Sequence, residues 1–260
     1  MAKEAERISD RISQFRYFNK QLGRPDWTGK KVLDFGGNIG GFLSGAHAQG
    51  KIDPRLYWCL DVYRPALAQG RRTHPHAHFV HFDRYNSEYN PTGIPGLPIP
   101  DLGTQFDFIL AFSVFTHIDA SEMLELVEQL QTRLAPDGVL AFTFCDQSYP
   151  ALPPNKGLRR MLIAHQKIEP NLDIERLLAE AAAARWCIWA DGVLHCEPGP
   201  SISQLVRRGQ PFESYDAFYT PEAMQSLFPQ ARILPPVPPE WQHCCVLSPD
   251  AAPSRGRSAG

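Results

Sequence analysis

The 260-residue sequence lacks any apolar run that approaches the roughly 18 residues needed to cross a bilayer. Its first residues are polar and charged, without the apolar core of a signal peptide. Basic residues never form a run longer than a pair, so the charge pattern does not suggest a surface that follows nucleic-acid phosphates. We therefore expect a soluble, cytoplasmic protein that binds neither membranes nor nucleic acid, and the oligomeric state stays open.

The sequence also lacks the cysteine spacing of a structural metal site. Its six cysteines form no C-x-x-C pair, and several lie in apolar runs, where a free cysteine behaves as a small hydrophobe. Neither His195-Cys196 nor His243-Cys244-Cys245 has the spacing of a zinc ribbon or finger. This pattern predicts a reduced protein without a bound metal.

Short apolar runs alternate with segments of helical period along much of the chain. Nearly unbroken apolar runs are typical of parallel strands whose two faces are both covered. The alternation predicts an α/β fold with a doubly wound, mostly parallel, seven-stranded sheet. The predicted strands are residues 31–36, 56–61, 78–83, 106–112, 138–145, 231–234 and 242–247, and the intervening helices include 40–49 and 120–134.

One long segment interrupts this alternation after the fifth strand. It is too long for a bare loop in a compact domain, and it contains two stretches of helical period, near 156–167 and 171–184. We interpret it as a helical lid or substrate-binding insertion. The predicted segments are an N-terminal helical segment (1–30), a Rossmann-like core (31–145), the insertion (146–216), the end of the core (217–248) and a disordered tail (249–260).

The strongest local signal is a glycine-rich turn between the first strand and the helix that follows. Asp34 lies near the end of the strand, before the first glycine, and Gly36, Gly37, Asn38 and Gly40 form the turn. Glycine permits positive φ and lets a ligand approach the backbone, and asparagine tolerates the same conformation. Ligands of open α/β sheets bind in the crevice beyond the carboxyl ends of the strands.

Two nucleotide ligands are compatible with this turn. With Asn38 in place of one glycine, Gly36 and Gly41 fit the G-x-G-x-x-G pattern of dinucleotide sites. An acid at Asp34 would repel a pyrophosphate, however, and suits a ligand that carries a cationic amine or sulfonium. The turn resembles the first motif of the class I S-adenosylmethionine-dependent methyltransferases, which usually have glycine where this chain has Asn38.

A second acid ends the next predicted strand. The carboxylate of Asp61, followed by Val62, can accept hydrogen bonds from ribose hydroxyls, as in other nucleotide-binding folds. Both nucleotide ligands would use this acid, so it does not distinguish between them. In the methyltransferase resemblance, Asp61 and Val62 belong to the cofactor site.

The third predicted strand leads into Asp83 and Arg84. The resemblance implies that Asp83 accepts a hydrogen bond from the adenine amine and that the next side chain covers the ring. Asn86 and Tyr89 are either further cofactor contacts or residues of a loop held by Asx turns.

The fourth predicted strand leads into Phe112, Ser113 and, four residues on, His117. In the methyltransferase family this turn faces the sulfonium and the substrate, which implies that Phe112 and Ser113 contact the cofactor. Histidine titrates near neutral pH, so His117 could act as a general base on an acceptor hydroxyl or carboxyl. The alternative is that it caps the next helix or lines the cofactor pocket.

Taken together, the resemblance covers about 31–145 and 218–248, and it implies an enzyme that uses S-adenosylmethionine. The acceptor expected is a small metabolite or modified peptide, methylated on oxygen. Two alternatives remain at this point: an NAD(P)-dependent oxidoreductase, and a non-catalytic binding protein with the methyltransferase fold.

Overall fold

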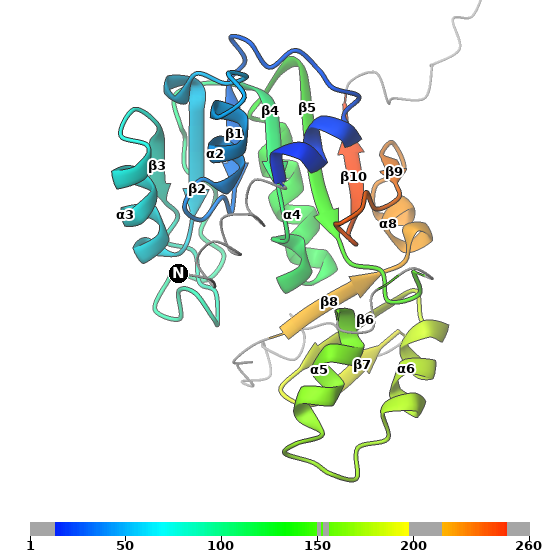
Figure 1. Cartoon of the computed structure of the whole chain (residues 1–260). Helices are drawn as coiled ribbons and strands as arrows, with labels where there is room; N and C mark the ends of the chain where they lie inside the picture. Colours follow the sequence, from blue (N-terminus) through cyan, green and yellow to red (C-terminus); the bar gives the residue numbers. More distant parts are fainter. Residues whose placement is uncertain (1–13, 150–151, 153–155, 198–214, 249–260) are drawn as a thin grey trace, which may run out of the picture.

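A computed structural model of the chain describes residues 14–149, 152, 156–197 and 215–248. Seven strands form one sheet in the order β3-β2-β1-β4-β5-β10-β9 (Figure 1). The first five run parallel, and β10 is antiparallel to both of its neighbours, so the predicted fold class is confirmed. The strands are β1 (Val32–Phe35), β2 (Tyr57–Asp61), β3 (His78–His81), β4 (Phe106–Ala111), β5 (Leu134–Phe144), β9 (Arg232–Leu234) and β10 (His243–Leu247).

Helices cover both faces of this sheet. Successive strand residues point to opposite faces, so Val32 packs in a core with helical residues 14–21 and α2, whereas Leu33 packs in a second core with α4 and α8. Both strand residues are fully buried. The helices of this domain are α2 (Gly41–His47), α3 (Arg64–Thr73), α4 (Ala120–Gln131) and α8 (Pro221–Leu227), with short 3-10 turns η1 (Pro54–Leu56) and η2 (Phe115–His117).

Side chains cap the starts of α4 and α8. Asp119 caps α4 by accepting hydrogen bonds from the N–H groups of Ser121 and Glu122, and Thr220 caps α8. Helix α4 ends at Gln131 and not at residue 134 as predicted, because Leu134 already belongs to β5 and pairs with Phe106 of β4. Sequence analysis did not identify α3, whose buried face is only Ala66, Leu67 and Gly70.

The insertion is not purely helical. Its helices α5 (Gly157–His165) and α6 (Ile174–Ala183) lie close to the predicted stretches, but the aromatic run after them is strand β6 (Trp186–Ala190). It pairs antiparallel with β7 (Val193–Cys196) and with β8 (Tyr215–Tyr219). The boundary expected after residue 216 therefore falls inside a strand.

The three-stranded sheet lies against the main domain at the carboxyl end of β5 (Figure 1). One of its faces packs on α5 and α6, and the other face contributes Ile188, Ala217 and Tyr219 to the core beside α4. Two hydrogen bonds of Tyr219 fasten β8 in place: its N–H donates to the carbonyl of Cys145 at 2.8 Å, and its hydroxyl donates to the carbonyl of Ile118 at 3.3 Å. This contact brings β8 next to the turn after β4.

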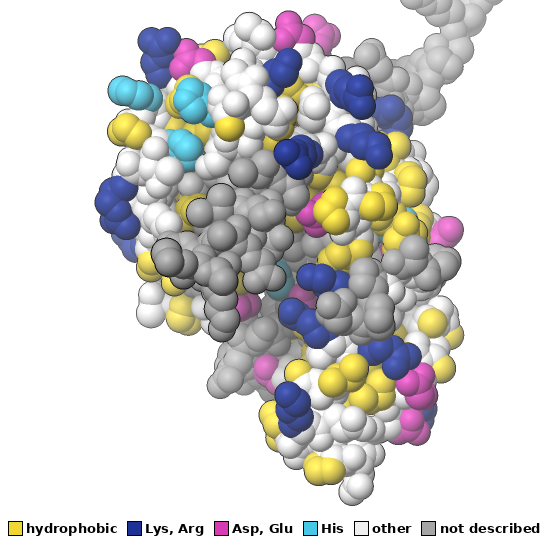
Figure 2. Space-filling model, in the orientation of Figure 1, with side chains coloured by type: hydrophobic (Ala, Val, Ile, Leu, Met, Phe, Trp, Pro, Cys, Tyr) yellow, Lys and Arg dark blue, Asp and Glu magenta, His cyan; other side chains and the backbone are white. Residues whose placement is uncertain are grey.

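Some sequence-based predictions concern residues outside the described part of the chain. The predicted N-terminal helix is present from residue 14, and its earlier part and the predicted tail over 249–260 lie outside. Among the described residues, no helix combines the length and the apolarity that a membrane span requires. On the face shown in Figure 2, the described Lys and Arg side chains are scattered rather than gathered in one stripe.

The central strand gives a first prediction about stability. Leu33 is fully buried in β1, so Leu33→Ala should lower the free energy of unfolding by about 2–5 kcal/mol through lost burial and a residual cavity. Leu124 on α4 is 40% exposed, and Leu124→Ala should change stability by less than about 0.5 kcal/mol. Urea unfolding of both variants tests the packing; equal effects would contradict it.

Candidate functional site

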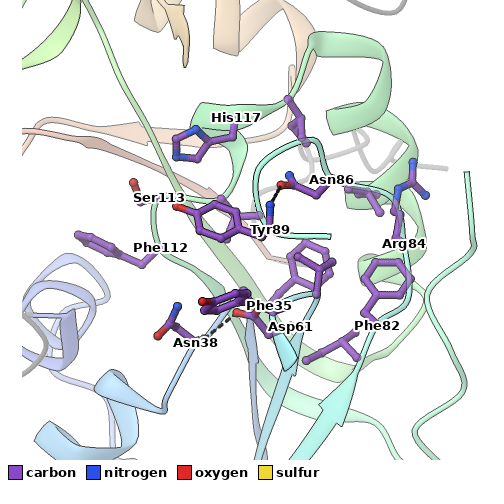
Figure 3. Close-up of a pocket in the computed structure, with 18 of the residues that line it drawn as sticks. Phe35, Asn38, Asp61, Phe82, Arg84, Asn86, Tyr89, Phe112, Ser113 and His117 are labelled. Carbon is purple, nitrogen blue, oxygen red and sulfur yellow. Dashed lines mark hydrogen bonds between the residues drawn. The ribbon is translucent and has the colours of Figure 1, made fainter. Parts of the chain in front are cut away.

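A cavity of about 410 Å³ opens at the carboxyl ends of β1, β2 and β4 (Figure 3). The strand register brings these ends together, because Phe35 pairs with Leu60 and Asp34 pairs with Leu110. Its volume lies in the range of about 300–1,000 Å³ that is typical of small-molecule sites. The cavity therefore lies where the topology of the sheet predicts a ligand.

The glycine-rich turn forms one wall of this cavity. Gly36, Gly37 and Asn38 line it, with φ of 72° at Gly36 and 55° at Asn38. A Cβ atom on Gly36 would collide with the side chain of Val114, and one on Gly37 would lie 2.6 Å from Cγ of Asp34. The turn is packed tightly from behind and stays open toward the cavity. Gly40 does not line the cavity; it starts α2 in a left-handed conformation.

Asp34 does not line the cavity, although the sequence predicted it there. Its carboxylate is 2% exposed, lies behind Gly37 and accepts a hydrogen bond of 2.6 Å from the hydroxyl of Tyr57. Burial raises the pKa of Asp34 to about 7, against a smaller opposing effect of the Tyr57 hydrogen bond. Asp34 therefore supports the turn from behind and does not line the cavity.

Asp61 occupies the middle of the cavity wall (Figure 3). One carboxylate oxygen accepts the N–H of Asn38 and the other accepts the N–H of Tyr63, each at 2.7 Å. A carboxylate oxygen has two lone-pair sites, so each oxygen can accept a further hydrogen bond from a ligand hydroxyl. Val62, next along the chain, also lines the cavity.

The residues after β3 differ most from the prediction. Asp83 is not among the cavity-lining residues; its Oδ1 accepts a hydrogen bond of 3.1 Å from Asn90. Arg84 lines the cavity, but its guanidinium donates to Glu122 at 2.9 Å and to Glu125 at 3.0 Å. The Arg84 side chain therefore fastens this segment to α4, and the predicted roles of these two side chains at adenine do not fit the geometry.

The turn after β4 forms the opposite end of the cavity, where Phe112 and Ser113 both line it. The Phe112 ring meets the edge of Tyr17 from the N-terminal helical residues. Ser113 has φ of 58°, its N–H donates to Thr143 at 2.7 Å, and its hydroxyl accepts from Gln242 at 3.0 Å. These bonds hold a non-glycine residue in a left-handed conformation at the cavity wall.

His117 lines the same end of the cavity and has a carboxylate partner. Its Nδ1 atom lies 3.5 Å from Oδ1 of Asp216, which β8 supplies, and both side chains are partly buried. Burial raises the pKa of Asp216, whereas the nearby His117 and Arg160 lower it. The insertion therefore contributes a charged group directly to the site.

Three side chains of this site that carry a charge or an amide were not predicted from the sequence. Gln14 and Glu122 line the cavity, and Asp216 pairs with His117. The position of Glu122 did not indicate a ligand site, because an acid in the first turn of a helix is ordinarily explained by its interaction with the helix dipole. Nor did the position of Asp216, since only the folded insertion brings it to the residues after β4. Asn86 and Tyr89, for which two roles were open, line the cavity, and the Asn86 side chain accepts the N–H of Tyr89 at 2.8 Å.

The raised pKa of Asp34 gives a prediction about pH dependence. Its folded pKa of about 7 exceeds the ordinary value of 3.8, so the protonated form stabilises the fold below about pH 4 and this contribution is lost as pH rises to about 7. Asp34→Asn removes that titration. The stability of the variant relative to the wild type should therefore rise between about pH 4 and pH 7 and then stay constant. Urea unfolding measures this difference; the same value at every pH would contradict the assignment.

Comparisons with known proteins agree with this geometry. A family model described as a methyltransferase domain matches residues 3–188. The search of curated proteins returned no match. Three solved structures share the fold at low sequence identity. The first is the glycopeptide N-methyltransferase MtfA in complex with S-adenosylmethionine, at 11% identity over 90% of this chain and 92% of that chain, with a TM-score of 0.52. The second is an S-adenosylmethionine-dependent methyltransferase from Clostridium acetobutylicum, at 9% identity over 92% of this chain and 91% of that chain, with a TM-score of 0.50. The third is DesVI from Streptomyces venezuelae, at 13% identity over 91% of each chain, with a TM-score of 0.50.

The family match spans well over half of the chain, and the predicted enzyme class is confirmed in preference to the dinucleotide alternative. The chain belongs to the methyltransferase domain family and has the fold of the S-adenosylmethionine-dependent methyltransferases, with S-adenosylmethionine as its cofactor.

Proposed function

We propose that the chain transfers a methyl group from S-adenosylmethionine to a hydroxyl oxygen of a small metabolite or a modified peptide. The observation that carries this proposal is the pair of His117 and Asp216 at the cavity, with 3.5 Å between Nδ1 and Oδ1. A hydroxyl acceptor must lose a proton when its oxygen forms the new bond to carbon, so it benefits from a base at this position.

The residues around the cavity fit the cofactor in three parts. Asp61 can accept hydrogen bonds from the ribose hydroxyls. The backbone of the glycine-rich turn, with Ser113 and Gln14, offers polar groups to the amino-acid portion. The apolar side chains of Phe82 and Leu126 suit the purine. When bound, the cofactor supplies a methyl group that is already activated by a positively charged sulfur.

The protein then contributes position and proton transfer. Nδ1 of His117 faces Asp216. In the proposed step the His117 imidazole would take the proton from the acceptor hydroxyl as the oxygen–carbon bond forms and the carbon–sulfur bond breaks. The carboxylate of Asp216 orients the ring and stabilises the imidazolium that results, as a carboxylate does in other catalytic pairs. Because β8 carries Asp216, docking of the insertion completes the site and helps to exclude water.

The open cavity also bears on the non-catalytic alternative. A binding protein that retained only the fold would not need a carboxylate that holds two backbone turns open toward a ligand-sized space. We therefore prefer an enzyme. A nitrogen acceptor is the competing chemistry, and the experiments below distinguish it.

Cofactor binding is the first test. S-adenosylhomocysteine, measured by calorimetry, should bind the folded protein, and Asp61→Ala should weaken that binding roughly tenfold or more because buried hydroxyls lose their acceptor. Asp53, which caps the exposed turn η1, provides the matched control, and Asp53→Ala should leave the affinity unchanged. A folded wild-type protein that shows no detectable binding would refute the proposed function.

The acceptor and the base are tested together. Cell extract incubated with isotopically labelled methyl donor should yield a labelled product whose label mass spectrometry places on oxygen. With that acceptor, His117→Ala should lower kcat about 10²–10⁴-fold while the affinity for S-adenosylhomocysteine changes little. His165, on α5 of the insertion, is the control histidine. A label on nitrogen, or full activity of His117→Ala, would show that the hydroxyl-directed mechanism is wrong.

A further inference from the structure

The cavity has two chemically different ends on either side of Asp61 (Figure 3). Asn38, Ser113 and His117 make one end polar. At the other end, Phe82 and Leu126 form an apolar slot. A nucleoside whose ribose binds at Asp61 must place its flat base at one of these ends, and the apolar slot matches a purine.

Only one carboxylate other than Asp61 lines this cavity within the described part of the chain. Glu122 projects from the first turn of α4, far along the chain from the acid that the sequence predicted at the adenine. That acid, Asp83, is bound to Asn90 outside the cavity lining. The group able to accept a hydrogen bond from the edge of the base is therefore on the helix and not on the segment after β3.

The Glu122 carboxylate is held in place from the protein side. Its Oε1 accepts the Nε–H of Arg84 at 2.9 Å, and the Arg84 side chain is only 6% exposed. Burial raises the pKa of Glu122, and the neighbouring Arg84 lowers it. Among the described residues, no protein donor reaches Oε2, which leaves this atom for a ligand.

We propose that Glu122 accepts a hydrogen bond from the exocyclic amine of the cofactor's adenine and so selects an adenine nucleoside over a base with a carbonyl at that position. Arg84 acts as a positioning residue, because it fixes the Glu122 carboxylate and favours its charged form. That form accepts hydrogen bonds and donates none. This inference rests on the proposed cofactor site, but it concerns the choice of base and not the methyl transfer.

Arg84 also offers a matched control. Its NH1 and NH2 groups donate to Glu125, at 3.0 Å, and Glu125 lies one turn further along α4 without lining the cavity. Glu122→Gln and Glu125→Gln therefore each remove one charge from the same guanidinium. Only the first changes the group that faces the ligand.

The experiment compares two ligands, S-adenosylhomocysteine and S-inosylhomocysteine, in which a carbonyl replaces the amine. Calorimetry should show that the wild type prefers the adenosyl ligand roughly tenfold or more, as expected for a hydrogen bond to a charged acceptor. Glu122→Gln should reduce that preference to about threefold or less, because an amide both donates and accepts. Glu125→Gln should keep the wild-type preference.

Three outcomes would overturn the inference: a wild type without the preference, a Glu122→Gln variant that retains it, or a Glu125→Gln variant that loses it equally. If Glu122→Gln does not fold, the wild type alone decides, since an analogue with hydrogen in place of the amine should bind roughly tenfold more weakly. A folded wild type that binds neither ligand would refute the proposed function itself, which is a distinguishable result.

Discussion

The hydrogen bonds of Asp61 are the interaction on which the site depends. One carboxylate joins the turn after β1, through the N–H of Asn38, to the turn after β2, through the N–H of Tyr63. These turns belong to neighbouring parallel strands, so the bonds fix the width of the crevice between them. Without this clamp, a turn with positive φ at Asn38 would lose the partner that holds it open, and the crevice would lose its ribose acceptor together with its shape.

The rest of the site is built outward from this clamp by elements that are distant in the sequence. The N-terminal helical residues pack Tyr17 against Phe112, and β10 begins beside Gln242, which binds Ser113. The insertion adds Asp216 opposite His117. The cofactor end therefore depends on the Rossmann-like sheet, whereas the proposed acceptor end depends on how the insertion docks. Acceptor choice can then change through the insertion while the cofactor site stays intact.

The sequence was sufficient for the parts of this architecture that follow from periodicity and turn chemistry. Apolar runs located the strands of the main sheet, because this signal is local. The direction of a side chain could not be predicted in this way, because it depends on residues that are distant in the sequence. Asp34 turns toward Tyr57 on the neighbouring strand, and Arg84 turns toward α4. Strand β6 was not predicted, because its aromatic run pairs with two later strands, and the second of them, β8, is distant in the sequence.

The account is tested most directly by a crystal structure of the protein with S-adenosylhomocysteine. It predicts that both ribose hydroxyls lie within hydrogen-bond distance of the Asp61 carboxylate, with the base in the slot beside Phe82 and the sulfur toward Ser113 and His117. A ligand bound elsewhere, or one whose ribose turns away from Asp61, would contradict the central role of that clamp.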